Sequence, residues 1–133
     1  MVNIKKKLEK NIVVLSPYSE DHDSFVEVSA LKYSFECFTS SSQLYNFLQE
    51  SALNYIVLIS SKIDDDFYNE IVKKTFKINN DTQIIIYSKY ASVEEVSSVI
   101  QLGVSHFSVG ENCFFDAVST IDEFFHDNFD NDF

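Results

Sequence analysis

Five short stretches of the chain are almost continuously apolar, and longer mixed segments separate them. The stretches are rich in β-branched or aromatic residues, and they cover Ile12–Leu15, Phe35–Phe38, Tyr55–Ile59, Gln83–Tyr87 and His106–Val109. A strand with one face in water alternates apolar and polar residues, whereas a continuously apolar strand is typical of a parallel sheet buried on both faces. The pattern therefore predicts five strands of a buried parallel sheet.

The segments between and after these strands carry apolar residues at helical spacing. Their ranges are 19–33, 40–51, 64–78, 92–103 and 111–129. In the clearest one, SVEEVSSVIQLG, Ser92 and Glu95 have the spacing of a capping box, and Gly103 suits the position after a helix end. Strand and helix thus alternate five times. This order predicts a three-layer α/β/α sandwich, with a five-stranded parallel sheet between two helical layers.

Length and composition fit one compact domain. The chain has 133 residues and is 45% hydrophobic, which is enough for a core of its own. We expect a basic N-terminal segment at residues 1–10, the domain at 11–127 and an acidic tail at 128–133. No apolar run approaches the roughly 20 residues of a membrane span. No apolar stretch follows the basic start, as it would in a signal peptide. We therefore expect no membrane insertion.

The charge narrows the classes of partner. The formal net charge is −11, and the chain contains no arginine. An acidic surface repels phosphate backbones and anionic lipids, and arginine is the usual bidentate phosphate ligand, so we expect no nucleic-acid binding. With only two glycines, a glycine-rich phosphate loop is excluded. Cys37 and Cys113 lack metal-ligand spacing, and we expect free thiols in a reducing cytoplasm.

Small residues follow four of the five predicted strands at the ends where a parallel sheet usually carries its site. They are Ser16, the pair Ser60 and Ser61, Ser88, and Gly110. In open α/β sheets, ligands bind outside the carboxyl ends of the strands. These residues are therefore the candidate site.

From about residue 10 to residue 127, the order and spacing of the elements resemble the receiver domain of two-component response regulators. The segment QLGVSHFSVG precedes the last predicted helix, and its GVSHF portion is similar to the turn of that family into the fifth strand. The resemblance implies the CheY-like, or flavodoxin-like, (βα)5 topology. It places Phe107 at the aromatic switch position and Ser88 at the position of the hydroxyl residue that senses the phosphoryl group.

The chain departs from this family at every charged position of the phosphorylation site. Two magnesium-binding acids are expected where Leu15 and Ser16 stand, and a phosphoaccepting aspartate where Ser60 or Ser61 stands, depending on register. Gly110 stands in place of a lysine. Aspartyl phosphorylation requires a carboxylate nucleophile and a hard cation held by oxygen ligands. The resemblance therefore predicts a pseudo-receiver that is no enzyme and holds neither metal nor cofactor.

Other chemistry has less support. Asp64–Asp66 begin a predicted helix, where acids favour the helix dipole, although a weak metal site or a displaced acceptor is an alternative. Asp21, His22 and Asp23 are neighbours in a helical turn that we expect to be solvated. His106 and His126 have no nucleophile partner that indicates a catalytic triad. A flavin-binding site is not indicated either. The loop after the first predicted strand contains acids, which would repel the flavin phosphate, and it contains no glycine.

The remaining function is protein binding. Aromatic residues make up 15% of the chain, and several are expected on outer faces, namely Tyr45, Tyr68, Tyr90, Phe115 and Phe129. In receivers, a face around the fourth helix and fifth strand carries partner contacts; here it would comprise Tyr90, Glu94, Ser105, His106 and Ser108. We expect a protein partner from a bacterial signalling pathway, or a second copy of the chain. The alternative is a switch controlled by serine phosphorylation or by a small ligand at the strand ends.

Overall fold

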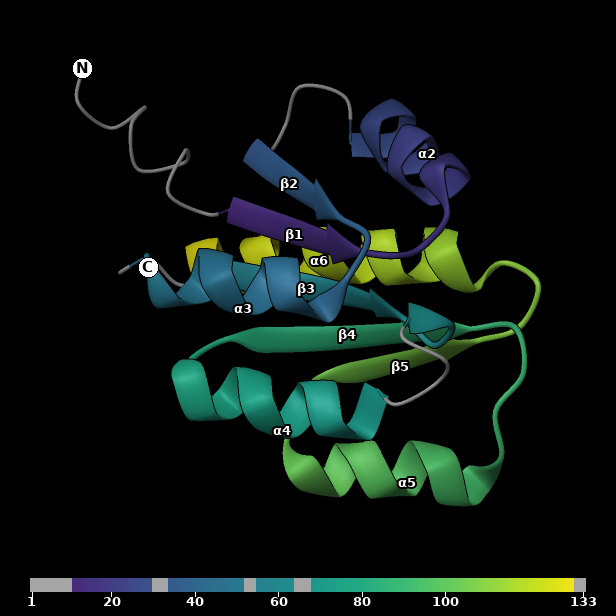
Figure 1. The fold of residues 1–133 in the computed structure, drawn as a ribbon. Coiled ribbons are helices and arrows are strands. Elements are labelled where there is room, and N and C mark those ends of the chain that lie inside the picture. The colour runs from purple at the N-terminus through teal and green to yellow at the C-terminus, as the bar shows by residue number, and fades with distance from the viewer. Residues whose placement is uncertain (1–10, 30–33, 52–54, 64–67, 131–133) are drawn as a thin grey trace.

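The computed structural model describes residues 11–29, 34–51, 55–63 and 68–130. Strands and helices alternate along these residues (Figure 1). The strands are β1 (Asn11–Leu15), β2 (Ser34–Phe38), β3 (Tyr55–Ser60), β4 (Gln83–Ser88) and β5 (His106–Val109). The helices are α2 (Ser19–Ser29), α3 (Ser41–Gln49), α4 (Tyr68–Ile78), α5 (Val93–Leu102) and α6 (Cys113–Asp130). All five predicted strands are therefore confirmed, each within one residue of its predicted ends.

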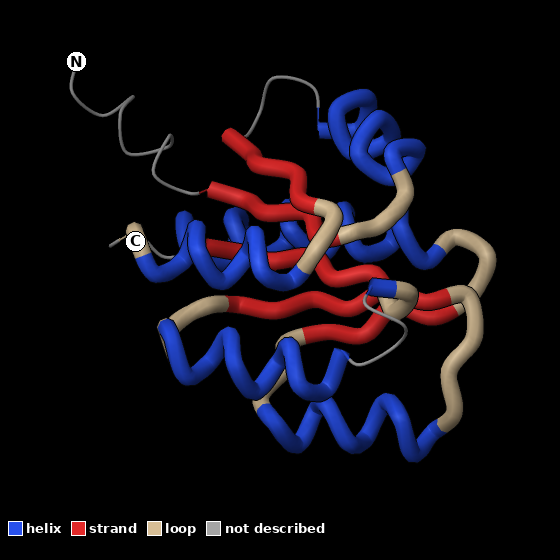
Figure 2. Tube along the Cα trace, viewed as in Figure 1, coloured by secondary structure: helices blue, strands red, loops and turns tan. Residues whose placement is uncertain are grey.

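The strands form one parallel sheet in the order β2-β1-β3-β4-β5. Helices α3, α4 and α5 cover one face of the sheet, and α2 and α6 cover the other (Figures 1 and 2). The predicted three-layer α/β/α sandwich with a five-stranded parallel sheet is confirmed. Because all strands are parallel, their carboxyl ends lie along one edge, and the loops that follow them meet there.

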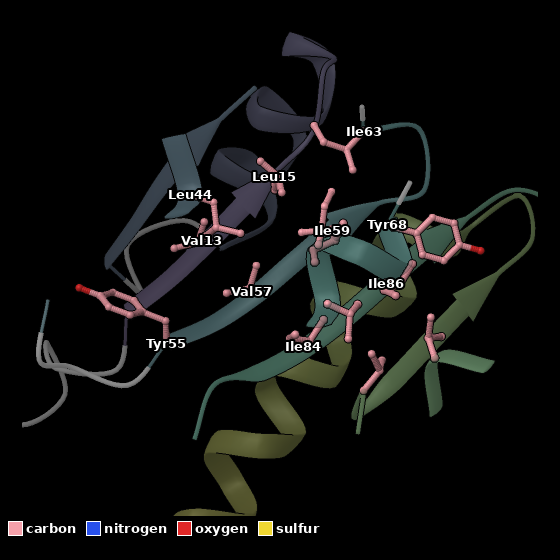
Figure 3. Packing of buried hydrophobic residues seen from close by; sticks show 14 of the residues in the cluster. Val13, Leu15, Leu44, Tyr55, Val57, Ile59, Ile63, Tyr68, Ile84 and Ile86 are labelled. Carbon is pink, nitrogen blue, oxygen red and sulfur yellow. The ribbon is translucent and has the colours of Figure 1, made fainter. Parts of the chain in front are cut away.

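The two faces of the sheet have separate hydrophobic cores, because alternate side chains of each strand point to opposite faces. On β3, Val57 and Ile59 pack toward α3, α4 and α5, whereas Ile56 and Leu58 pack toward α2 and α6. Figure 3 shows the first of these cores, with Leu44 of α3 and Tyr68 of α4 beside the strands. Burial on both faces explains why β3 is apolar at every position up to Ser60.

Helix α5 has the ends that its sequence predicts. The Ser92 hydroxyl accepts a hydrogen bond from the Glu95 amide at 3.1 Å, and the Glu95 carboxylate accepts one from the Ser92 amide at 2.8 Å. This is a capping box. Gly103 follows the helix with φ +113°, a left-handed conformation that favours glycine. Both predicted end signals are therefore confirmed.

The predicted division into segments remains a prediction. Residues 1–10 and 131–133 lie outside the described residues, and α6 continues to Asp130, past the predicted domain end at residue 127. Within the described part of the chain, every helix is too short or too polar to cross a membrane.

Candidate functional site

The carboxyl ends of the three central strands lie side by side. In the sheet register, Leu15 of β1 pairs with Ile59 of β3, the next residue Ser60 pairs with Tyr87 of β4, and Ser88 pairs with Val109 of β5. The backbone amide of Ser61 donates to the Tyr87 carbonyl at 3.0 Å, so the β3–β4 pairing continues for one residue beyond the strand. The serines predicted to share an edge therefore do so.

Two of these serines bond to each other. The Ser61 hydroxyl donates to the Ser88 hydroxyl at 2.8 Å, and the Ser88 hydroxyl donates to the backbone carbonyl of Tyr90 at 2.6 Å. Ser61 and Ser88 are each only 7% exposed. Their hydroxyls therefore form a buried hydrogen-bond chain from β3, through β4, to the loop before α5.

Ser60 occupies the last position of β3 and makes a different contact. Its hydroxyl accepts a hydrogen bond from the Lys62 amide at 3.2 Å, and its side chain is buried. Ser60 thus stands at the strand end itself, whereas Ser61 is the serine that joins Ser88. Which of the two corresponds to the phosphoaccepting aspartate of receivers stays a prediction.

A carboxylate from α2 reaches the same edge of the sheet. Asp21 accepts hydrogen bonds from the Ser16 hydroxyl at 2.6 Å and from the Tyr87 hydroxyl at 2.9 Å. Burial is the main cause that raises the pKa of the Tyr87 hydroxyl, and the Asp21 carboxylate adds to it, so Tyr87 is a neutral donor. The prediction that the Asp21 turn is merely solvated is wrong, because its carboxylate is the acceptor for two buried hydroxyls.

The two non-serine members of the predicted pocket differ in position. The side chain of Leu15 is fully buried in the core on the α3, α4 and α5 face, so its place in the pocket lining is corrected. Gly110 has φ +120°, a left-handed conformation that favours glycine, and its amide donates to the Ser88 carbonyl at 3.1 Å. A side chain at Gly110 would meet open space but also backbone strain.

Metal-binding groups do not gather at this edge. Among the residues that the structure describes, no three His, Cys, Asp or Glu side chains are placed to hold a metal ion. Asp21 turns to Ser16 and Tyr87, while Asp23 is exposed. Asp64–Asp66 lie outside the described residues, so their helix-start interpretation stays a prediction. Beside the single carboxylate of Asp21, the described strand ends present hydroxyls and backbone groups, and not the several carboxylates that usually hold a hard cation.

Both cysteines are free, as predicted. Burial is the main cause that raises the pKa of the Cys113 thiol and of the Cys37 thiol. At neutral pH they are therefore predominantly protonated, which is the less reactive form.

Phe107, the residue at the switch-like position, packs toward α4. Its ring is half-buried against the core and lies edge-on to the ring of Tyr68, with centroids 6.1 Å apart. The Tyr68 hydroxyl in turn donates to the Glu95 carboxylate of α5 at 3.2 Å. Tyr68 is buried, so the prediction that it lies on an outer face is wrong. Phe107 therefore contacts α4, whereas Ser88 contacts Ser61 and the loop before α5.

The residues of the predicted partner face differ in exposure. Tyr90 and Glu94 are exposed, and Ser105 is exposed and donates to the Gln83 side chain. In contrast, Ser108 is only 2% exposed, and its hydroxyl donates to Asp116 of α6 at 2.7 Å. Its place on a partner face is therefore corrected, because its side chain points to α6.

His106 lies on the same side of β5 as Ser108. Its Nε2 atom is 3.1 Å from the Asp116 carboxylate, and its side chain is partly exposed. Asp116, like Asp21, was missed by sequence reasoning as a contact residue. In the sequence, each of these two acids is marked only by its position in the first turn of a helix that follows a strand end. Of the other aromatics predicted to lie outside, Phe115 is exposed, Tyr45 is half-buried, and the side chain of Phe129 lies outside the described residues.

We expect Asp116 to make the stability of the fold depend on acid pH. A hydrogen bond from Ser108, followed by one from His106, holds the pKa of Asp116 below its ordinary value. A carboxyl with a lowered pKa stabilises the fold above its ordinary pKa, and this stabilisation is lost as the pH falls through the lowered value. In urea unfolding, wild type should therefore be more stable than Asp116→Asn at pH 6, with the difference shrinking below about pH 4. The control is Glu123→Gln on the same helix; an equal pH response in both variants would contradict the assignment.

Comparison with known proteins supports the fold alone. The sequence matches no protein-family model, and no curated protein is similar to it in sequence. The structure is similar to a CheY-like receiver domain protein from Methanospirillum hungatei JF-1, with TM-score 0.75 and 18% identity over 92% of this chain and 98% of that one. It is also similar to the response regulator DrrB, a Thermotoga maritima OmpR/PhoB homolog, with TM-score 0.75 and 14% identity over 90% of this chain and 54% of that one.

A third similar structure is the beryllofluoride-activated NtrC4 receiver domain dimer, with TM-score 0.70 and 11% identity over 83% of this chain and 93% of that one. All three structures therefore match over most of this chain at low sequence identity. The chain has the CheY-like fold of response regulator receiver domains.

Proposed function

We propose that this chain is a receiver-like signalling module that acts through protein–protein contact and without aspartyl phosphorylation. The observation that carries the proposal is the set of residues at the strand ends. Ser60 ends β3 and Ser61 follows it, Ser16 follows β1 and Gly110 follows β5, so these positions hold no carboxylate and no amine. The receiver fold supports a signalling function, and the residues at the strand ends support the absence of aspartyl phosphorylation.

The hydrogen bonds at these strand ends support the same proposal. The hydroxyls of Ser16, Ser61 and Ser88 are buried and already donate to Asp21, Ser88 and the Tyr90 carbonyl. Transfer of a phosphoryl group to aspartate requires a carboxylate and a bound cation that neutralises the transferred charge. The one carboxylate described in this network, that of Asp21, comes from α2 rather than from the end of β3, and it already accepts hydrogen bonds from Ser16 and Tyr87. We therefore infer a binding module with no catalytic residue and no cofactor.

A signalling module without aspartyl phosphorylation would act by binding a partner. The activated NtrC4 receiver is a dimer in its solved structure, and other structures with this fold come from response regulators. For this chain we propose a protein partner in a bacterial signalling pathway, with a second copy as the alternative partner. The two free cysteines support a cytoplasmic location, because reduced thiols persist there.

The alternative, control by serine phosphorylation or a small ligand at the strand ends, has less support. Ser60, Ser61 and Ser88 are all buried and hydrogen-bonded, so a kinase would have to open the edge of the sheet to reach them. Intact mass of the protein from its native host tests this alternative. A species heavier by one phosphoryl group that disappears in Ser60→Ala or Ser61→Ala would favour it.

The proposal predicts no response to a phosphoryl analogue. With beryllofluoride and Mg²⁺ added, the amide NMR spectrum should stay unchanged at Ser60, Ser88 and Gly110, because the described strand ends offer no carboxylate pair for the cation. A receiver domain with an intact acidic site, treated in parallel, is the positive control. Saturable shifts at these three residues would overturn the proposal.

A further inference from the structure

A cavity of about 560 Å³ lies at the edge of the sheet where β4 and β5 begin, opposite to the edge that carries the serines. Gln83, the first residue of β4, and Ser105, directly before β5, both line it. Helices α4 and α5 end at the same edge (Figure 1). Binding sites for small molecules commonly have volumes of about 300–1,000 Å³, so this cavity is large enough for a ligand.

One wall of the cavity is apolar. The Phe76 ring of α4 and the Leu102 side chain of α5 line it, and both are partly buried against the core. A Cβ atom at Gly103 would lie 3.3 Å from the Cε2 atom of Phe76, so the ring lies against the turn that follows α5. This wall can pack against a short hydrocarbon chain, and the face of an aromatic ring also attracts a cation.

The charge at the cavity is negative. Among the described residues that line it, Asp81 is the only charged one, and neither ion pair of the described residues involves Asp81. Lys77, in the last turn of α4, is exposed and is not among the lining residues. The carboxyl ends of α4 and α5 add partial negative charge, because the last carbonyls of a helix have no partner within it. The cavity therefore favours a cation over an anion.

The buried hydroxyl of Thr82 is an independent sign of a ligand. Thr82 is only 5% exposed, and its hydroxyl has no hydrogen-bond partner in the described part of the chain. The Thr75 hydroxyl and the His22 Nε2 atom are in the same state, but of these three residues only Thr82 lines the cavity. Buried polar groups nearly always have a partner. Nearby, the Ser105 hydroxyl donates to the Gln83 Oε1 atom at 2.9 Å, and this oxygen can accept a second hydrogen bond.

We propose that this cavity binds a small organic cation, a guanidinium or ammonium group on a short hydrocarbon chain. Such a group only donates hydrogen bonds, and it is complementary to the acceptor oxygens of Asp81, Thr82 and Gln83. The hydrocarbon chain lies against Phe76 and Leu102. Because the cavity is at the opposite edge of the sheet from the serines, this inference goes beyond the proposed function and does not depend on it.

An amide NMR titration of the full chain with n-butylguanidinium tests this site. The signals of residues 80–83 and 102–105 should shift saturably, with a dissociation constant on the order of 1 mM for so small a ligand. Two probes with the same hydrocarbon chain separate charge from apolar contact. Butan-1-ol should bind roughly threefold more weakly, and butyrate should not bind at these residues. Added salt should weaken the binding of the cation.

The role of the carboxylate is tested with two matched variants. Asp81→Asn should weaken n-butylguanidinium roughly threefold, as the loss of an exposed ion pair does, and should leave butan-1-ol unchanged. Asp23→Asn makes the same change at an exposed acid of α2 and should alter neither affinity.

The role of the hydroxyl is tested with Thr82→Val, which replaces it by a methyl group of similar size. Since the hydroxyl has no partner in the fold, this variant should be at least as stable as wild type in urea, yet bind n-butylguanidinium roughly threefold more weakly. Thr120→Val is the matched control. Thr120 is also buried, and its hydroxyl donates to the Asp116 carbonyl at 3.0 Å, so this variant should lose stability and keep its affinity.

Several results would overturn the proposal. They are equal affinity for butyrate or butan-1-ol, shifts centred away from residues 80–83 and 102–105, and unchanged binding of n-butylguanidinium by Asp81→Asn. A loss of stability in Thr82→Val as large as that in Thr120→Val would show that the Thr82 hydroxyl has a partner within the fold, and would also count against the site. The beryllofluoride result is independent, so failure of this proposal leaves phosphorylation independence standing.

Discussion

Ser60→Asp should be less stable than Ser60→Asn at pH 7.5 by about 2–4 kcal/mol, because the new carboxylate is buried without a cation to pair it. Ser60 is buried at the end of β3, and its hydroxyl makes one hydrogen bond, with the Lys62 amide. In receivers an aspartate at this strand end has a metal ion and a lysine nearby. Here Ser16 and Gly110 stand at the corresponding ends of β1 and β5.

The pH dependence of this difference distinguishes charge from shape. Burial raises the pKa of a carboxyl, so the introduced aspartate is neutral in the fold at low pH. Its destabilising effect should be absent below about pH 4, and it should grow as the pH rises toward the raised value. Urea unfolding at about pH 3.5 and pH 7.5 measures both variants, and asparagine matches aspartate in size. Equal stability of the two variants at pH 7.5 would show that the strand ends do hold a cation or a lysine near Ser60.

The same variant tests whether the acceptor alone is missing. Ser60→Asp should not take up a phosphoryl group from acetyl phosphate in the presence of Mg²⁺, because the cation ligands are still lacking. Intact mass spectrometry measures this directly. A product heavier by one phosphoryl group would show that a single substitution restores the site, and that the rest of the pocket is intact.

The strands could be predicted closely because their sequence signal is local. A parallel strand buried on both faces is apolar along its buried length, as β3 is up to Ser60 and β4 is from Ile84 to Tyr87. The same reasoning predicted which strand ends meet, since the carboxyl ends of parallel strands share an edge. It could not predict that Ser61 rather than Ser60 bonds to Ser88, because that depends on how the chain turns just beyond β3.

Helix faces were predicted less well than strands. In α4 the buried residues are Tyr68, Ile71, Val72 and Thr75, which follow helical spacing. More than one set of residues in α4 has the helical spacing of a buried stripe. One such set includes Phe76, which is only partly buried. Tyr68 therefore turned out to be buried where an outer position was expected. In the short strand β5, alternate side chains point to opposite faces of the sheet. Ser108 faces α6, and only the register of the sheet reveals this.

The Asp21 contact could not be predicted from sequence either, and it has a large expected effect. Asp21→Ala removes the acceptor for the hydroxyls of Ser16 and Tyr87, both of which are buried. Each buried donor left without a partner costs about 1–3 kcal/mol, so for the two donors we expect a loss of about 2–6 kcal/mol in the free energy of unfolding. Urea unfolding at pH 7 measures it.

Matched variants separate this hydrogen-bond network from the charge of α2. Asp23→Ala removes an exposed acid from the same helix and should change stability by less than about 0.5 kcal/mol. Asp21→Asn keeps an acceptor oxygen and should fall between the two. In a double-mutant cycle, Tyr87→Phe should cost less in the Asp21→Ala background than in wild type, because the tyrosine hydroxyl has already lost its acceptor. Additive effects of Asp21→Ala and Tyr87→Phe would mean that Asp21 does not hold Tyr87, and that α2 is fixed to the strand ends by apolar packing alone.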